Sequence, residues 1–393
     1  MAKPGTVGAG CGVVLAGSLA QRPGFGGHTW VFLQYLLGFR ALGCEVTFLD
    51  RLDRSTSFDE HGHPCSPARS ANFRYTASVM DGFGLTDDFA VASDEGGGWL
   101  GLCRSAVLQR VKRASVLINV MGFLEDPEVL AAANRRVFLD IDPGFGQMWK
   151  QLGLADVFAG HDVFVTVGEN IGRDECDIPP AGLDWITTRP PVILGQWPMV
   201  TPEDGPFVSI GSWRGPYAPV AYEGRSFGLR VHEFRKFFEL PARTGRPFEL
   251  ALDIDAAEKS DLHALFSSGW RLQNPVDSTG DPWRYRRYIQ GAGAEFMVAK
   301  GMYVESRSGW FSDRSACFLA SGKPVMAQDS GMSANYPTGE GLLTFADADQ
   351  AEAAADQIAS DYSAHARAAR GLAEEYFDSR LVLGELLSAV TSN

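Results

Sequence analysis

Short apolar runs recur along the first half of the chain, and most of them end at a glycine or a polar turn. These runs are Cys11–Gly17, Glu45–Asp50, Val116–Val120, Val137–Ile141 and Val163–Val167. Continuous apolar runs of this length are typical of parallel strands that are buried on both faces. Between the first two runs, His28–Leu42 places apolar side chains at helical spacing, and Gly43 follows as a candidate C-cap. The first half therefore predicts a parallel sheet with covering helices.

A proline-rich segment then separates this half from a second one with the same alternation. Its seven prolines are Pro179, Pro180, Pro190, Pro191, Pro198, Pro202 and Pro206. Such proline density is typical of a connection between domains. Beyond it we expect strands at 207–210, 248–254, 295–298 and 324–327, and helices near 231–243, 257–266 and 313–320. From Asp347 the composition, rich in Ala, Leu and Glu, predicts a helical tail.

These patterns predict an α/β protein with two Rossmann-like domains that face each other across a cleft. We place the N-terminal domain at residues 1–203 and the C-terminal domain at 204–376. Residues 377–393 are expected to form a C-terminal helix that packs back on the N-terminal domain. Residues 51–98 are more polar, and we interpret them as an insertion over the sheet edge.

Composition narrows the class of protein. The chain has 393 residues, 45% hydrophobic and 21% charged, so it can bury a sizeable core. Its net charge of −13 argues against nucleic acid as a partner. No apolar run of about 18 residues exists, so we expect no integral membrane segment, and we interpret Val13–Ala20 as a strand rather than part of a signal peptide. We expect a cytoplasmic protein.

Six cysteines are spread along the chain without a CxxC pair. This spacing argues against a zinc site, a redox motif and a disulfide framework.

A glycine-rich loop opens the first predicted helix. It reads Pro23-Gly24-Phe25-Gly26-Gly27-His28. Gly26 and Gly27 allow a ligand to approach the backbone, and the positive end of the helix keeps the His28 imidazole neutral, as a general base requires. A hydrogen-bonded capping histidine is an equally good interpretation. The loop lacks the dinucleotide fingerprint, which makes NAD binding a weak alternative.

Polar residues follow two further strands of the first half. Asp140 and Asp142 end one strand and alternate along it, so both point to the same side, as a metal site or an orienter of His28 requires. Glu169 and Asn170 follow the next strand. Ordinary turn capping also explains such residues.

The densest cluster of candidate residues is Lys300–Gly331. Arg307, Ser308 and Gly309 precede a helix that starts near Ser312 and Asp313, and Lys300 adds another cation. Backbone N–H groups at a helix start together with cations form a diphosphate site. A second glycine-framed loop, Gly211-Ser212-Trp213-Arg214-Gly215, supplies a further arginine.

The GGH loop, the segment SGWFSDRSACFLASGKPVMAQDSG and the helical tail together resemble the GT-B glycosyltransferases. In that family the C-terminal domain binds the nucleotide-sugar and the N-terminal domain binds the acceptor. The resemblance places Ser308, Gly309, Ser312 and Asp313 in the donor loop and His28 at the position of the base of inverting members. Ser315–Cys317 stand where many retaining members carry a glutamate, and Glu305–Arg307 replace the His-Gly-Gly of many inverting members.

We therefore expect a hexosyltransferase-like glycosyltransferase that moves a sugar from a nucleoside-diphosphate sugar to a small-molecule or glycan acceptor. It would need no cofactor and no obligatory metal. His28, with Asp142 or Asp140, is expected to be catalytic, and Gly26, Gly27, Glu169 and Asn170 to bind the acceptor. The expected donor-binding residues are Gly211, Ser212, Arg214, Lys300, Arg307, Ser308, Gly309, Ser312 and Asp313.

Two alternatives remain open on the sequence. One is a metal-dependent transferase that uses Asp140 and Asp142, and the other is a non-catalytic nucleotide-sugar-binding protein.

Overall fold

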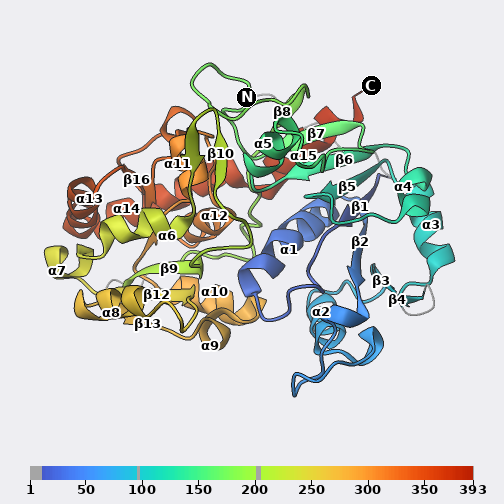
Figure 1. The fold of residues 1–393 in the computed structure, drawn as a ribbon, viewed down its shortest axis with the longest axis horizontal. Helices are drawn as coiled ribbons and strands as arrows, with labels where there is room; N and C mark the ends of the chain where they lie inside the picture. The colour runs from blue at the N-terminus through green and yellow to red at the C-terminus, as the bar shows by residue number, and fades with distance from the viewer. Residues whose placement is uncertain (1–10, 95–97, 201–204, 393) are drawn as a thin grey trace. The chain divides into compact units, whose positions relative to one another are not determined.

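The computed structural model describes residues 11–94, 98–200 and 205–392, and the expected domain boundary at 203 and 204 lies outside them (Figure 1). The chain divides into two compact units. The first comprises residues 1–141, 157–166 and 379–393, and the second comprises 142–156 and 167–378. Residues 142–156 and 167–200 thus group with the second unit, although the sequence placed them in the first domain.

The first unit is built on a mostly parallel sheet. The strands of this unit lie in the order β4-β3-β2-β1-β5-β6-β7, and among these pairs only β3 and β4 run antiparallel. The strands are β1 (Gly12–Ala16), β2 (Glu45–Leu52), β3 (Phe89–Ser93), β4 (Trp99–Gly101), β5 (Val116–Val120), β6 (Arg136–Asp140) and β7 (Val163–Thr166). Its helices are α1 (Gly26–Ala41), α2 (Ala71–Gly82), α3 (Arg104–Arg113), α4 (Pro127–Ala132) and α15 (Ser379–Thr391).

The second unit contains a parallel sheet with the order β13-β12-β9-β14-β15-β16 and a separate hairpin of β10 and β11. The strands are β8 (Trp185–Thr187), β9 (Phe207–Ser212), β10 (Val220–Tyr222), β11 (Arg225–Phe227), β12 (Phe248–Asp253), β13 (Arg271–Leu272), β14 (Ala294–Met297), β15 (Val325–Gln328) and β16 (Leu342–Phe345). The helices are α5 (Phe145–Gln151), α6 (Arg230–Phe234), α7 (Leu240–Thr244), α8 (Lys259–Ser267), α9 (Pro275–Thr279), α10 (Pro282–Gly291), α11 (Gly301–Glu305), α12 (Asp313–Ala320), α13 (Ala348–Ser360) and α14 (Tyr362–Leu372).

Both sheets reverse their strand order once, between β1 and β5 in the first unit and between β9 and β14 in the second. This is the order of a doubly wound α/β fold, in which ligands bind at the carboxyl ends of the strands next to the reversal. The prediction of two Rossmann-like α/β halves is confirmed. Each unit therefore has its own expected ligand edge.

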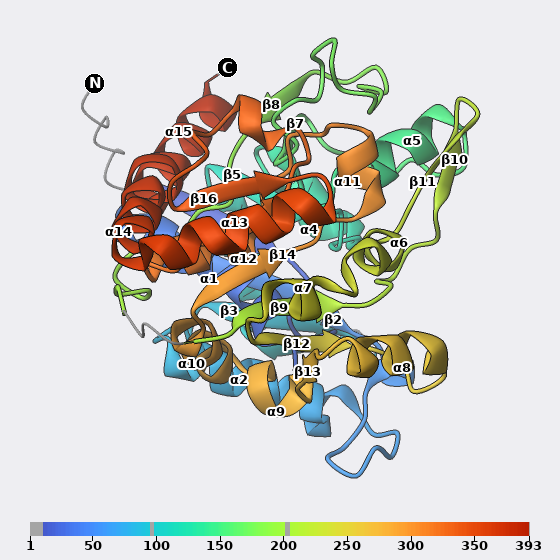
Figure 2. The ribbon, with the colours of Figure 1, turned by 90° about the vertical axis from the view of Figure 1, so that its left-hand side faces the viewer.

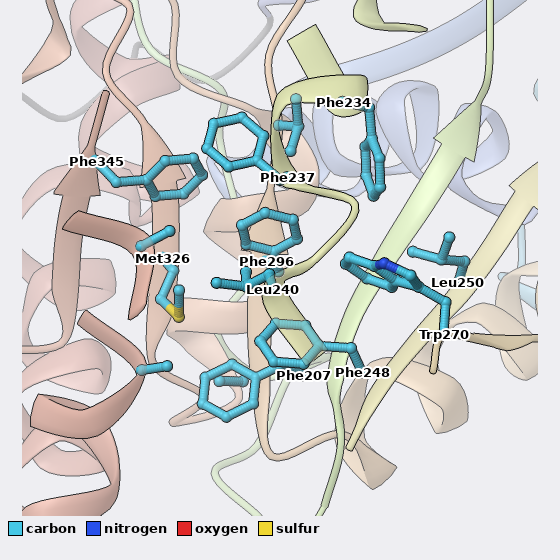
Figure 3. Packing of buried hydrophobic residues seen from close by; sticks show 14 of the residues in the cluster. Phe207, Phe234, Phe237, Leu240, Phe248, Leu250, Trp270, Phe296, Met326 and Phe345 are labelled. Atoms are coloured by element: carbon cyan, nitrogen blue, oxygen red, sulfur yellow. The ribbon is translucent and has the colours of Figure 1, made fainter. Parts of the chain in front are cut away.

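Aromatic side chains fill the core of the second unit (Figure 3). The rings of Phe296 and Phe345 stack with centroids 5.2 Å apart, and those of Phe207 and Phe248 stack at 5.0 Å. Helices α13 and α14 contact β16 beside this core (Figure 2). Such rings each remove a large apolar area from water, so they hold the strands that carry the ligand edge.

Two sequence expectations differ from the observed elements. Residues 51–98, which we interpreted as an insertion, contain α2 and β3. Strand β3 pairs with β2 on one side and with β4 on the other, so this segment extends the sheet beyond β2. The helix expected at 231–243 is broken into α6, a 3-10 turn and α7, and Pro241 lies in the first turn of α7. Proline suits a helix start because it lacks the N–H that an interior position needs.

The C-terminal helix α15 packs against α1 inside the first unit. Gly38 of α1 allows the close approach, since a Cβ built there would lie 2.4 Å from Cδ1 of Leu383 and 3.2 Å from Cβ of Ser379.

Candidate active site

In the first unit, the turn after β1 brings His28 to the expected ligand edge. Gly17 directly follows the strand at a position where a Cβ would lie 2.2 Å from the ring of Phe32, so only glycine lets α1 pack this closely. Helix α1 begins at Gly26, two residues before His28. Gly26 and Gly27 therefore form part of its first turn, where backbone N–H groups lack partners within the helix.

The His28 ring is held by Ser18. Its Nε2 lies 3.1 Å from the Ser18 carbonyl oxygen and 3.0 Å from the Ser18 hydroxyl. A carbonyl oxygen only accepts, so Nε2 carries the proton and donates, and the acceptor lone pair of the neutral ring lies on Nδ1. Burial and, after it, the charge of Arg22 lower the pKa of His28 to about 4. The imidazole is therefore neutral at pH 7.

The two aspartates expected beside His28 have other partners. Asp140 is buried and accepts a hydrogen bond from Oγ1 of Thr166 at 2.9 Å. Asp142 belongs to the second unit, where it pairs with Lys300. Ser18, rather than either carboxylate, is thus the hydrogen-bond partner of the His28 ring.

Asp50, two residues before the end of β2, fixes the loop that carries Ser18. Its carboxylate accepts hydrogen bonds from the backbone N–H of Ala20 at 2.6 Å and from the side chain of Gln21 at 2.9 Å. This role could not be predicted from the sequence, because only the pairing of β1 with β2 brings Asp50 near Ala20.

In the second unit, Arg230 lies against the end of β9. Gly211 has φ of 145°, and a Cβ built there would lie 2.1 Å from Nη1 of Arg230. Nη1 also donates to the Ser212 carbonyl oxygen at 3.4 Å, while no described residue hydrogen-bonds to Nε. Burial and the nearby charge of Arg314 lower the pKa of Arg230 to about 10. The guanidinium is thus a charged group short of partners beside the strand reversal.

Lys300 follows β14, the strand on the other side of this reversal. Its Nζ lies 2.5 Å from the carboxylate of Asp142, which also accepts a hydrogen bond from the hydroxyl of Tyr303. The same Nζ lies 5.1 Å from the ring centre of Phe145 and 5.8 Å from that of Tyr217. Aromatic faces attract a cation, so this ammonium is held in one place.

Arg214, the arginine expected at the diphosphate, is engaged elsewhere. Its Nε forms an ion pair with Glu258 at the start of α8. Trp213, next to it, is buried and donates to Asp261 at 2.9 Å. In the predicted loop Gly211–Gly215, the backbone of Gly211 and Ser212 lies next to the guanidinium of Arg230.

Arg307, Ser308 and Gly309 form a packed junction with Asn170. The Asn170 amide donates to the carbonyl oxygens of Arg307 at 3.0 Å and Gly331 at 3.1 Å. A Cβ on Gly309 would lie 2.7 Å from the Asn170 side chain. Asn170, expected to bind the acceptor, is thereby used in joining two loops of its own unit.

Glu169 is likewise surrounded by partners. It accepts hydrogen bonds from the Tyr336 hydroxyl and, at 3.2 Å, from Nε of Arg189. Burial raises the pKa of Glu169, although both partners lower it.

The start of α12 carries the carboxyl group of Asp313, whose pKa is raised by burial. The Asp313 carboxylate accepts the backbone N–H groups of residues 313 and 314. Ser312, the N-cap residue, makes no side-chain capping bond. Arg314 is buried and pairs with Glu295 at 2.5 Å. An anionic ligand at this helix start would have to compete with Asp313.

Two further observations concern membrane insertion and metal binding. Within the described ranges, no helix is long and apolar enough to cross a membrane. In the same residues, no group of three or more His, Cys, Asp or Glu side chains is placed to hold a metal ion.

Comparison with known proteins gives matches in structure alone. No protein-family profile and no curated protein sequence matches the chain. Among solved structures, HepE of Anabaena in complex with UDP-glucose covers 97% of this chain and 100% of its own, with a TM-score of 0.57 and 11% identity. An alpha-glucosyltransferase bound to UDP-glucose and DNA covers 97% and 99%, with a TM-score of 0.57 and 12% identity. AviGT4, a glycosyltransferase involved in avilamycin A biosynthesis, covers 97% of each chain, with a TM-score of 0.54 and 13% identity.

Proposed function

We propose that this chain, which has the GT-B fold, is a glycosyltransferase that moves a sugar from a nucleoside-diphosphate sugar to an acceptor hydroxyl. The observation that carries the proposal is the likeness over nearly the whole chain to proteins such as AviGT4 and the alpha-glucosyltransferase. At these identities the likeness concerns the fold, so the chemistry is argued below from the residues of each unit.

The diphosphate of the donor is proposed to bind at the β9–β14 reversal of the second unit. Arg230 and Lys300 supply positive charge on the two sides of this reversal. As the sugar leaves, negative charge grows on the diphosphate, and fixed cations stabilise that charge more strongly than they stabilise the bound donor. We propose that Arg230, rather than Arg214, binds the diphosphate. Arg307 and the start of α12 are proposed to lie beside the diphosphate site without forming its main contacts.

Uridine diphosphate is the first nucleotide to test. HepE and the alpha-glucosyltransferase were both solved with UDP-glucose. Nothing in the described residues of this chain selects a base, so the identity of the nucleotide rests on those neighbours.

The acceptor is proposed to bind at the β1–β5 reversal of the first unit, beside His28. A neutral imidazole whose Nε2 donates to Ser18 has its Nδ1 lone pair available for an acceptor hydroxyl. Base catalysis there fits an inverting reaction. Glu169 and Asn170, which are bound within the second unit, are proposed to support the fold rather than the acceptor.

We further propose that no metal is obligatory. Asp142 already has a cation as its partner, and Asp140 is buried with a hydroxyl donor. If activity with the natural acceptor is abolished by EDTA and restored by a divalent cation, the metal-dependent alternative is correct.

The function is tested by incubating the protein with UDP-glucose, other nucleotide-sugars and a panel of hydroxylated acceptors. We expect release of the nucleoside diphosphate together with a glycosylated product detected by mass spectrometry. Binding of a nucleotide-sugar without turnover over a broad panel would instead support a non-catalytic binding protein.

A further inference from the structure

Two cysteines from separate parts of the sequence stand side by side at the amino end of the first sheet. Strands β1 and β2 pair in parallel with Gly12 opposite Glu45, so the preceding residues, Cys11 and Cys44, are also opposite each other. The backbone N–H of Glu45 donates to the Cys11 carbonyl oxygen at 2.9 Å, which fixes this register. Residues opposite each other on neighbouring parallel strands point to the same face of the sheet.

The geometry of this pair suits a disulfide. Neighbouring strands lie about 4.8 Å apart, and disulfides join residues whose Cα atoms are about 4.4–6.8 Å apart. The Cys11 and Cys44 thiols are hydrogen-bonded to each other, and both are free. Little backbone movement is therefore needed to join the two sulfur atoms.

The surroundings give the two thiols different access to solvent. Cys44 is 5% exposed, whereas Cys11 is partly exposed. Burial, and then the hydrogen bond with Cys11, raises the pKa of Cys44 to about 12. Cys11 is thus the sulfur that a dissolved reagent reaches first.

A cavity of about 460 Å³ has Cys44 in its wall, together with Gly12, the residue that follows Cys11. Arg40, Arg110 and Arg113 line this cavity together with two carboxylates, those of Glu45 and Asp88. The cavity lies at the amino ends of β1 and β2, opposite the edge that carries His28. Arg110 pairs with Asp88 and Arg113 with Glu45, so the cavity provides room and one net positive charge for a small anionic disulfide such as oxidised glutathione.

We propose that Cys11 and Cys44 form a redox-active dithiol, which a low-molecular-weight disulfide oxidises to an internal disulfide that joins β1 to β2. The inference does not depend on the proposed glycosyltransferase activity. The sequence concealed the pair, because the spacing of the two cysteines is not that of a redox motif and strand pairing alone brings them together.

The oxidation proceeds by two thiol–disulfide exchanges. The Cys11 thiolate attacks one sulfur of oxidised glutathione, whose S–S bond breaks, and the released glutathione takes up a proton. The Cys44 thiol then loses its proton to solvent, and its sulfur attacks the Cys11 sulfur of the mixed disulfide and releases the second glutathione. Two electrons and two protons pass from the chain to the two glutathione molecules.

The test uses a Cys103→Ser background. Cys103 is exposed at the start of α3, and hydrogen bonds, chiefly from Ser105, lower the pKa of its thiol, so it would otherwise react first. After incubation with oxidised glutathione, we expect the intact chain to contain a new internal disulfide that joins the Cys11 peptide to the Cys44 peptide in a non-reducing digest. The oxidised chain should also unfold at a higher temperature, because the cross-link restricts the unfolded chain.

Two further variants in the same background separate the roles of the thiols. With Cys44→Ser, Cys11 should retain one glutathione because the second exchange is blocked, and with Cys11→Ser the buried Cys44 should stay reduced. The deciding measurement is the non-reducing digest of the Cys103→Ser protein itself, so the test does not depend on the folding of either further variant. If that chain keeps both thiols, or carries glutathione on Cys11 with no Cys11–Cys44 peptide, the proposal is wrong.

Discussion

Lys323 is a lysine buried without a hydrogen-bond partner among the described residues. It precedes β15, is 0% exposed, and burial lowers its pKa to about 8. An ammonium group removed from water in this way destabilises the folded chain unless a partner compensates.

Replacing Lys323 by Met should therefore raise the free energy of unfolding. The pKa difference between an ordinary lysine, at 10.5, and about 8 in the folded chain corresponds to a gain of about 3 kcal/mol at pH 7. Between these pKa values the unfolded chain binds more protons, so wild-type stability should rise from pH 8 to pH 10.5 and the advantage of the variant should shrink. Urea denaturation at several pH values measures this.

Lys112→Met, on the exposed face of α3, serves as the matched control and should change stability by less than about 0.5 kcal/mol. A Lys323→Met protein less stable than wild type at pH 7, or a gain that does not vary with pH, would contradict this account of Lys323.

His28 allows catalysis and stability to be tested on one side chain. His28→Gln can still donate a hydrogen bond to Ser18 but cannot take a proton, so kcat should fall by about 10²–10⁴ with unchanged affinity for the donor.

The pKa of His28 is about 4, below the ordinary 6.5, so its stabilising contribution is complete above pH 6.5 and is lost as pH falls to 4. The Gln variant should lose less stability than wild type over this interval.

His263→Gln, on the exposed side of α8, is the control and should leave kcat unchanged. Near-normal turnover of His28→Gln would show that His28 is structural and that the acceptor proton goes to another group.

At the scale of elements, the contact of α1 with α15 depends on Gly38 and Leu383 together. Leu383 is 0% exposed, and truncation of such a residue to Ala should cost about 2–5 kcal/mol. A methyl group on Gly38 would overlap Cδ1 of Leu383, at 2.4 Å, in the wild type but would partly fill the space left by Leu383→Ala.

The double variant Gly38→Ala, Leu383→Ala should therefore be more stable than the sum of the single effects by about 0.5–3 kcal/mol. Equilibrium unfolding in urea followed by circular dichroism gives the four free energies. Additivity within about 0.3 kcal/mol would mean that the two residues do not share the contact.

The sequence predicted the central strands of both sheets because those strands are buried on both faces and read as unbroken apolar runs. Strand β4 (WLG) was missed because it has only three residues and lies on the sheet edge. The helix break before Pro241 was missed although proline signalled it. The formation of a short strand at a sheet edge depends on packing against neighbouring elements more than on the strand's own residues.

For the molecule as a whole, contacts between residues far apart in the sequence could not be predicted, and this limited which candidate site residues the sequence suggested. His28 became a candidate because it follows a glycine-rich loop at the start of a predicted helix, and Lys300 because it closely follows a strand signal, and both assignments remain predictions. Arg230 was not among the candidates because it reaches Gly211 from the next helix, and the pairing of Asp142 with Lys300 was not foreseen. The net charge of −13 is a property of composition alone, and the expectations of a cytoplasmic protein without nucleic-acid partners remain predictions.

The proposed donor site is tested by titration calorimetry of UDP into the wild-type protein, Arg230→Ala and Arg214→Ala. We expect UDP to bind the wild type, Arg230→Ala to weaken binding by about 1.5–3 kcal/mol through loss of charged hydrogen bonds to the diphosphate, and Arg214→Ala to change the affinity little. If UDP and the other nucleoside diphosphates fail to bind the folded wild-type protein, or if Arg230→Ala binds as tightly as wild type, the donor site proposed here is contradicted.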